Sequence, residues 1–233
     1  MRNNRLNIFI LIVSLAVLTG CAAPEPADPG PPPPQNLIAS TDQLQLVTEV
    51  SLDLAREYGG ESVLVVLEID KTLLSMDPYP ACDPASRDTV RPTQADAADQ
   101  IRRMQEAGLR VIALTGRGLS CRDQTFRELS VNGFDFASSG WPPDGGYPDP
   151  FLPEGGNRAV MYQEGVFLTD GQDKGVMLKQ LLEKSAVRYP RLIVMADAEQ
   201  SDLNSVMKAF SWTPTKVHAW RYTRDVSVEV VSD

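Results

Sequence analysis

The sequence of 233 residues has little of several residue types, and each shortage excludes a class of site. It has one histidine, His218, which excludes a site built from several histidines. It has no CxxC pair, no HExxH and no Walker-type glycine-rich loop, so the common zinc, metalloprotease and P-loop motifs are absent. Lys and Arg number 22 against 31 Asp and Glu, giving a formal net charge of −9. An acidic chain of this kind argues against nucleic-acid backbones and anionic lipid head groups as partners.

Cysteine is also scarce, with Cys82 and Cys121 the two that follow the N-terminal region. Outside the cytoplasm these thiols could form a disulfide, which would tie a proline-rich segment to a later helix. The alternative is two free, half-buried cysteines. Because the sequence gives no distance between them, both interpretations stay open.

The N-terminus has no apolar run long enough to span a membrane, but it has the pattern of a signal peptide. Arg2 and Arg5 precede an apolar segment, 8–18, and a small-residue cleavage site follows. Leu-Thr-Gly-Cys at 18–21 resembles the lipobox of bacterial lipoproteins, which implies removal of residues 1–20 and lipidation of Cys21. Removal would lower the net charge from −9 to −11. An ordinary secretory signal with an incidental cysteine is the alternative.

Three regions follow from this interpretation. Residues 1–20 are the predicted signal peptide, 21–39 a lipid-anchored linker and 40–233 one globular domain. The linker has four consecutive prolines at 31–34, which favour an extended, semi-rigid spacer. The lipoprotein resemblance, with Ala22 after the cysteine, implies a protein held in the bacterial cell envelope at the periplasmic face of the outer membrane, bound to it only through Cys21.

Short apolar runs alternate with helical patterns along the domain, which predicts an α/β fold with a mainly parallel sheet. We expect buried strands at 63–69, 109–114 and 192–196, a hairpin at 159–169 and a last strand at 216–222. Helices are expected from 40 or 41 to 58, from 93 to 108 with Thr93 as its cap, from 119 to 132, from 173 and from 201 to 210. Residues 138–158 contain five prolines and five glycines and should form a long loop.

Acidic and hydroxyl side chains follow the three buried strands. Glu68 and Asp70 follow the first strand, Thr115 ends the second and Asp197 follows the third, while Lys174 starts the helix before the third. The carboxyl ends of parallel strands meet at one edge of a sheet, where α/β folds bind ligands. Carboxylates there can hold Mg²⁺, and a hydroxyl and an ammonium suit phosphate oxygens. Together these residues indicate a phosphoryl-transfer site.

These residues resemble the motifs of the haloacid dehalogenase (HAD) superfamily. Its first motif, Asp-x-Asp-x-Thr/Val, matches residues 68–72 except that Glu68 replaces the first Asp. The second and third motifs match Thr115 and Lys174, and the fourth matches Asp197, with either Ala198 at its second acid or Asp202 in an Asp-x4-Asp spacing. The closest resemblance is to a bacterial family filed as domain of unknown function 2608. The resemblance implies a three-layer α/β/α sandwich with a Rossmann-like sheet and little or no separate cap domain.

The resemblance also implies an activity, with secreted lipoprotein acid phosphatases of the superfamily as the analogy. A Mg²⁺-dependent phosphomonoesterase acting on a small phosphorylated substrate would use Glu68 as nucleophile or metal ligand and Asp70 as acid/base. Glu68, Asp197 and the Asp70 backbone carbonyl would hold the metal, and Thr115 and Lys174 the phosphate. Glu68 is one methylene longer than Asp, and an error of about 1 Å can cost about a hundredfold in rate. The alternative is therefore a catalytically inactive HAD-like scaffold that binds a ligand or an envelope protein.

Three further residues have two interpretations each. Arg117 is a phosphate contact or a solvated residue at a helix start, and we favour the second. Trp141 either contributes to a ligand-binding loop with Tyr147 or closes the long loop over the core, and we favour the core. His218 is interpreted as a satisfied strand side chain rather than a base, because its neighbours alternate as in a strand.

Overall fold

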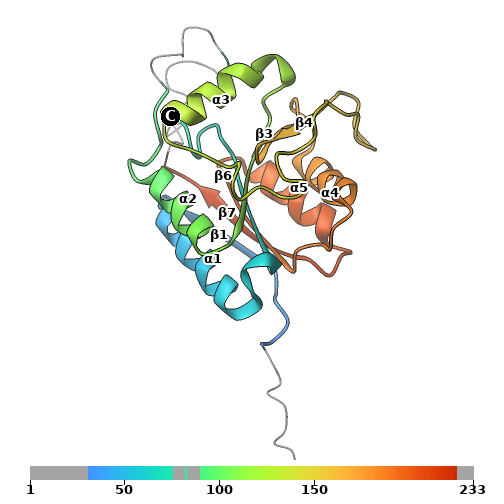
Figure 1. Ribbon diagram of the computed structural model, residues 1–233. Coiled ribbons are helices and arrows are strands. Elements are labelled where there is room, and N and C mark those ends of the chain that lie inside the picture. The colour runs from blue at the N-terminus through green and yellow to red at the C-terminus, as the bar shows by residue number, and fades with distance from the viewer. Residues whose placement is uncertain (1–30, 76–81, 83–89, 225–233) are drawn as a thin grey trace, which may run out of the picture. The chain divides into compact units, whose positions relative to one another are not determined.

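The computed structural model describes residues 31–75, 82 and 90–224, and its strands form one seven-stranded sheet (Figure 1). The strand order is β1-β7-β6-β2-β3-β5-β4, and every neighbouring pair is parallel except β4 with β5. The strands are β1 (Leu37–Thr41), β2 (Val63–Leu67), β3 (Arg110–Thr115), β4 (Met161–Gln163), β5 (Val166–Leu168), β6 (Leu192–Asp197) and β7 (Lys216–Tyr222). The α-helices are α1 (Leu44–Tyr58), α2 (Ala97–Glu106), α3 (Arg122–Val131), α4 (Lys174–Ser185) and α5 (Gln200–Phe210).

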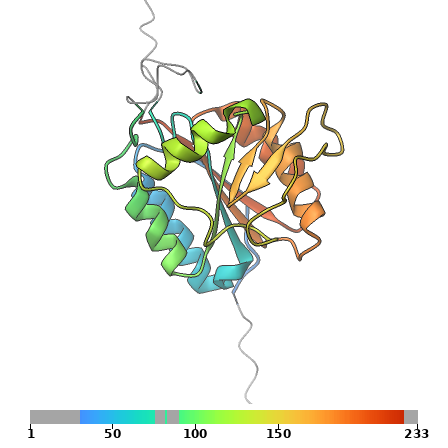
Figure 2. The ribbon, with the colours of Figure 1, turned by 45° about the horizontal axis from the view of Figure 1, so that its top comes forward.

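Helices cover both faces of the sheet, as Figures 1 and 2 show. On one face α1, α2 and α3 pack against alternate side chains of β2 and β3, including Val65 and Val111. On the other face α4 and α5 pack against the intervening side chains, including Val66 and Ile112. The expected three-layer α/β/α fold with a mainly parallel sheet is confirmed.

The β2 strand is the centre of this arrangement because all five of its residues are buried. Valine and leucine fit a strand with both faces covered, since the side chains on each face are then removed from water. Burying each such side chain contributes about 1.5–3 kcal/mol to folding. The rigid strand fixes the position of the residues that follow it, starting with Glu68.

The direction in which the sheet grows reverses beside β2. From β2 the chain adds β3 and β5 on one side and then crosses to add β6 and β7 on the other. Ligands in open α/β sheets bind at the carboxyl ends of the strands that flank such a reversal. Here those strands are β2 and β6, and the register pairs Leu67 with Ala196. Glu68 and Asp197 therefore leave neighbouring strands at the same level.

The N-terminal part of the described chain differs from its prediction. Residues 37–41 form an edge strand parallel to β7, so the helix expected from 40 or 41 begins only at Leu44. The sheet accordingly starts at Leu37, before the boundary drawn at residue 40. Thr93 does not cap α2, because its hydroxyl donates to the carbonyl of Thr72 at 2.6 Å and the helix begins at Ala97. The predicted signal peptide and Cys21 lie outside the described residues.

The long loop is ordered by aromatic packing. Trp141 is buried, and its indole N–H donates to Ser185 Oγ at 2.8 Å, which confirms its expected place in the core. Phe151 stacks on Phe167 of β5, and Lys184 lies over the Tyr147 ring at 4.7 Å. The loop is thus part of the layer that covers β4 and β5. Within the described residues, no helix is long and apolar enough to cross a membrane.

Candidate active site

Glu68 is the first residue after β2, and its carboxylate turns back into the protein. One oxygen, Oε1, accepts the backbone N–H groups of Ile69 at 2.6 Å and Asp70 at 3.1 Å. The other oxygen, Oε2, accepts a hydrogen bond from the Lys174 ammonium. The residue is 5 % exposed. The carboxylate thus binds its own backbone and the lysine together.

The Lys174 ammonium lies among three carboxylates. Besides Glu68, it contacts Asp197 Oδ2 at 2.6 Å and Asp202 Oδ2 at 2.7 Å. An ammonium has three N–H donors, so each can serve one of these acids. Asp173 caps α4 by accepting the Val176 N–H at 2.8 Å, which confirms the predicted helix start. The helix start thus fixes the lysine at the β2–β6 reversal.

Burial and charge shift the proton affinities of this cluster in opposite directions. Burial raises the pKa of Glu68 and raises the pKa of Asp197 to about 7, although the Lys174 ammonium counteracts both changes. Burial alone would lower the pKa of Lys174, but the charges of Glu68 and Asp197 outweigh it and raise that pKa above its ordinary value. Lys174 is therefore a permanent cation in a cluster whose acids outnumber it.

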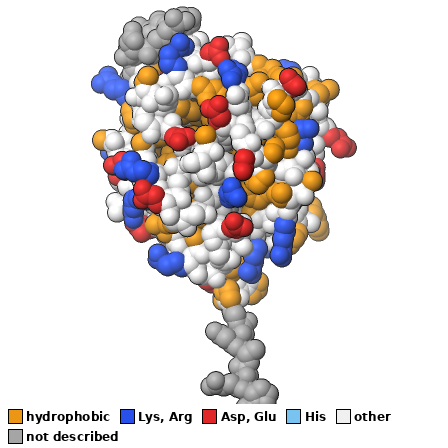
Figure 3. All heavy atoms as spheres, viewed as in Figure 1, with side chains coloured by type: hydrophobic (Ala, Val, Ile, Leu, Met, Phe, Trp, Pro, Cys, Tyr) orange, Lys and Arg blue, Asp and Glu red, His pale blue; other side chains and the backbone are white. Residues whose placement is uncertain are grey.

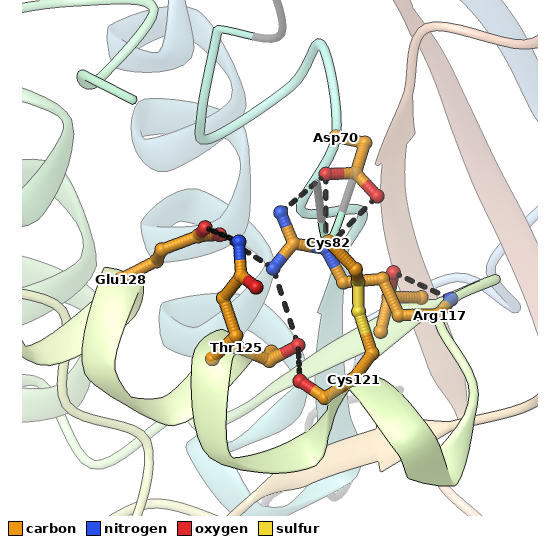
Figure 4. The surroundings of a disulfide bond; sticks show 8 residues. Asp70, Cys82, Arg117, Cys121, Thr125 and Glu128 are labelled. Carbon is orange, nitrogen blue, oxygen red and sulfur yellow. Dashed lines mark hydrogen bonds and ion pairs between the residues drawn. A yellow bond between two sulfur atoms is a disulfide. The ribbon is translucent and has the colours of Figure 1, made fainter. Parts of the chain in front are cut away.

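Asp70 and Arg117 form a second ion pair at the same edge (Figure 4). Arg117 Nε lies 3.1 Å from both carboxylate oxygens of Asp70, and a terminal nitrogen lies 2.7 Å from one of them. On its other side Arg117 donates to Thr125 Oγ1 at 3.1 Å and Glu128 Oε2 at 2.7 Å, both on α3. The favoured interpretation of Arg117 as a solvated residue is wrong, because its side chain is 1 % exposed. It holds Asp70 in place.

The Cys82–Cys121 disulfide lies next to this pair (Figure 4). Cys121 is the N-cap residue of α3, and its carbonyl accepts the Thr125 hydroxyl at 2.9 Å. The hydroxyl in turn accepts from Arg117. The disulfide therefore anchors the end of the helix that positions the arginine. Of the two interpretations open for these cysteines, the structure supports pairing.

Two threonines stabilise the loops at the strand ends. Thr115 ends β3 with no exposed surface, and its Oγ1 accepts the Arg117 N–H at 3.2 Å. Thr72 Oγ1 accepts the Ala198 N–H at 3.1 Å, which joins the loop after β2 to the loop after β6. Thr72, the last residue of the first motif, therefore has a structural role in this chain. It keeps the loops carrying the acids at a fixed separation.

The structure brings the predicted residues Glu68, Lys174 and Asp197 into direct contact, and it places Asp70 and Thr115 at the same sheet edge. For the fourth motif it favours the Asp-x4-Asp spacing, because Asp202 reaches the lysine. Sequence reasoning gave no role to Glu128, which is buried against Arg117. A glutamate at a core-facing position of the predicted helix at 119–132 was the available signal.

Three of these acids could hold a cation. Ligand oxygens of Glu68, Asp197 and Asp202 all lie within 4.8 Å of one another. An all-oxygen, anionic donor set fits a hard cation such as Mg²⁺. The Lys174 ammonium contacts the same three carboxylates, so a metal and the lysine would share these ligands.

A model described as a protein of unknown function, DUF2608, matches residues 85–229, more than half of the chain. The chain belongs to the DUF2608 family. The DUF2608 match includes Thr115, Lys174, Asp197 and Asp202 and begins after Glu68 and Asp70. The expected membership is confirmed, while residue roles do not follow from a family of unknown function.

Among solved structures, two of the similar chains are class C acid phosphatases from Bacillus anthracis, one with tungstate bound. Each shares 15 % sequence identity over 77 % of this chain, with a TM-score of 0.45, and the alignments cover 76 % and 75 % of the phosphatase chains. With so low a sequence identity and TM-score, the similarity carries no information on the activity of this DUF2608 protein. No curated protein matches the sequence.

Proposed function

We propose that this protein is a divalent-cation-dependent phosphomonoesterase that acts on a small phosphorylated molecule. The observation that supports the proposal is the meeting of Glu68, Lys174, Asp197 and Asp202 at the β2–β6 reversal, with Asp70 and Thr115 at the same edge. Three carboxylates face one ammonium there, and the Arg117 charge is shared between Asp70 and Glu128. Such an edge repels a phosphate dianion unless a further cation is bound.

Glu68, Asp197 and Asp202 would hold Mg²⁺, which supplies positive charge to the transferring phosphoryl group. Lys174 would add a second positive charge beside the phosphate oxygens, and the Thr115 hydroxyl would donate a hydrogen bond to one of them. A Glu68 oxygen would attack phosphorus as the ester P–O bond breaks. Asp70 would give a proton to the leaving oxygen and later take one from the water that hydrolyses the acyl phosphate.

The proposal is tested by hydrolysis of an aryl phosphate with the purified protein and Mg²⁺. We expect turnover that chelation removes and that Asp70→Asn reduces at least about a hundredfold, because general acid–base catalysis contributes on that order. Asp99→Asn is the matched control, since Asp99 is an exposed helix residue paired with Arg102. Absence of turnover across a panel of phosphate esters would refute the proposal.

A second candidate is supported by the hydrogen bonding of Glu68. Both of its oxygens are engaged by protein donors, and both oxygens of Asp70 face Arg117. This arrangement fits an inactive scaffold in which the acids serve structure. Glu68→Asp separates the candidates: activity that appears only in this variant shows that the remaining site is competent and that the glutamate silenced it. Wild-type turnover dependent on Asp70 excludes the scaffold.

We also propose that the protein is anchored in the bacterial envelope through a lipid on Cys21. The basic, apolar and small-residue pattern of 1–21 supports the anchor, and the Cys82–Cys121 disulfide fits a compartment outside the cytoplasm. Mass spectrometry of the N-terminal peptide from native membranes should find a diacylglyceryl adduct on Cys21. In Cys21→Ser the adduct and membrane retention should both be lost, and retention of this variant in membranes contradicts the anchor.

A further inference from the structure

A pocket of about 520 Å³ lies at the opposite, amino edge of the sheet. Its lining includes Ser62, which precedes β2, Arg110, which begins β3, and Arg191, which precedes β6. The residues proposed for phosphoryl transfer lie instead at the carboxyl edge of the sheet. The amino-edge pocket is therefore a separate site, and it does not depend on the proposed function.

Three arginines, Arg110, Arg188 and Arg191, line the pocket against one acid, Glu61. Within the described residues, none of the three forms an ion pair. Arg110 donates one hydrogen bond, to the Gly140 carbonyl at 3.2 Å. The Arg191 guanidinium lies 4.8 Å from the centre of the Tyr58 ring. Because a guanidinium carries five N–H donors, most donors here are left for a ligand.

A cluster of three arginines around one pocket is unexpected for a chain of net charge −9. Like charges repel, so gathering guanidinium groups around one pocket without an anion is unfavourable. Figure 3 shows several Lys and Arg side chains in blue along the lower part of the molecule, the end at which α1 finishes in Figure 1. Acidic residues dominate the sequence, yet the pocket has a local positive excess.

We propose that this pocket binds the phosphate group of an organic phosphate. Arginine forks match the paired oxygens of a phosphate and bind it with charge-assisted hydrogen bonds. Trp141, Pro142 and Val187 form an apolar part of the same wall and would contact the organic group. A bare inorganic ion would leave that part of the wall unused.

The phosphate could belong to a soluble metabolite or to a phospholipid head group. The described chain begins at this edge: Tyr58 at the end of α1 donates to the Pro32 carbonyl at 2.9 Å, and Val217 N–H donates to Asn36 Oδ1 at 2.9 Å. Residues 31–36 therefore lie at the same edge of the sheet as the pocket. The chemistry is shared by both sources, and the experiment separates them.

The test measures binding of the full-length protein to sn-glycerol 3-phosphate by calorimetry, and to phosphatidylglycerol vesicles by co-sedimentation. Chelator is present throughout, so that the acidic edge holds no divalent cation. The variant is Arg188→Ala/Arg191→Ala, and the matched control is Arg102→Ala/Arg158→Ala, which removes two exposed arginines that do not line the pocket. Thermal melting checks that all three proteins are folded.

We expect wild type and control to bind at least one probe, and the Arg188/Arg191 variant to bind it at least about tenfold more weakly because two charged donors are lost. Binding of glycerol phosphate identifies a soluble ligand, and binding of vesicles alone identifies a head group. Glu68→Gln should leave binding unchanged. Absence of binding to both probes overturns the proposal, as does equal binding by the double variant or a loss caused by Glu68→Gln instead.

Discussion

The basic side chains at the two edges of the sheet differ in whether they are paired with acids. At the carboxyl edge, Lys174 and Arg117 are buried and each is paired with carboxylates from other elements. At the amino edge, Arg188 and Arg191 line an open pocket without an ion-pair partner among the described residues. A buried charge must be paired within the protein, whereas an exposed charge remains available. The first edge therefore needs an additional cation to attract phosphate, and the second needs none.

The most disruptive test of this contrast is Lys174→Met. It removes the ammonium from three carboxylates and should lower the free energy of unfolding by about 3–5 kcal/mol without divalent cations, because buried acids lose their partner. Chemical denaturation measures the change. Added Mg²⁺ should restore part of the loss, since the acids regain a cation. Lys179→Met is the control, because its pair with Glu183 is exposed. Equal effects of the two substitutions would contradict the role given to the buried cluster.

Opening the disulfide should have an effect of similar size, confined to the carboxyl edge. Cys82→Ser/Cys121→Ser opens a link with a sequence separation of 39 residues and should cost about 4 kcal/mol through the entropy of the unfolded chain. Because Cys121 anchors α3, the proposed phosphatase activity should fall as well. Binding of organic phosphate at the amino edge should persist under conditions where the variant is folded. A variant that keeps wild-type stability in denaturant titrations refutes the expectation.

Gly175 tests how the lysine is positioned. A Cβ at this residue would overlap the backbone carbonyl of Ser205, where α4 approaches α5. Gly175→Ala should therefore push the helices apart and cost about 1–3 kcal/mol, the usual penalty of overpacking. It should also weaken the dependence of melting temperature on Mg²⁺, since Lys174 and Asp202 move relative to each other. Lys179→Ala on the same helix should change melting by far less, and an equal change would count against the close approach.

The smallest effect is expected at the amino edge. Trp212 is 98 % exposed in the loop before β7 and does not line the pocket. Trp212→Ala should change the free energy of unfolding by less than about 0.5 kcal/mol, as surface substitutions usually do. Its affinity for sn-glycerol 3-phosphate should equal that of wild type in the same calorimetric assay. A tenfold loss would place the ligand outside the arginine pocket.

Much of the fold could be predicted because it follows from local pattern. The apolar runs of β2, β3 and β6 and the capped start of α4 are readable without distant partners. The edge strand β1 was missed, because five mixed residues have no pattern of their own and become a strand only by pairing with β7. The start of α1 was placed too early for the same reason.

The site was predictable to the extent that it lies at strand ends. Glu68, Asp197 and Lys174 were found through their places relative to buried strands. The burial of Arg117 was not, since it depends on Glu128 and on the packing of α3, neither of which spacing reveals. The pairing of Cys82 with Cys121 also required a three-dimensional distance, a Cα separation of 5.6 Å. The amino-edge pocket joins residues from four separate stretches of the chain, so no local sequence motif predicts it.

The parallel pairing of β1 with β7 has a mechanical consequence. Five residues of β1 align with His218–Tyr222, and the strand runs from the amino edge toward the carboxyl edge. A pull applied ahead of Leu37 along the strand axis acts on this ladder in shear, so the hydrogen bonds share the load instead of breaking one after another. Asn36 adds a further bond to Val217 at the point where tension enters. In a chain tethered by its first residues, tension would therefore load the β1–β7 hydrogen bonds in the direction in which they resist it best.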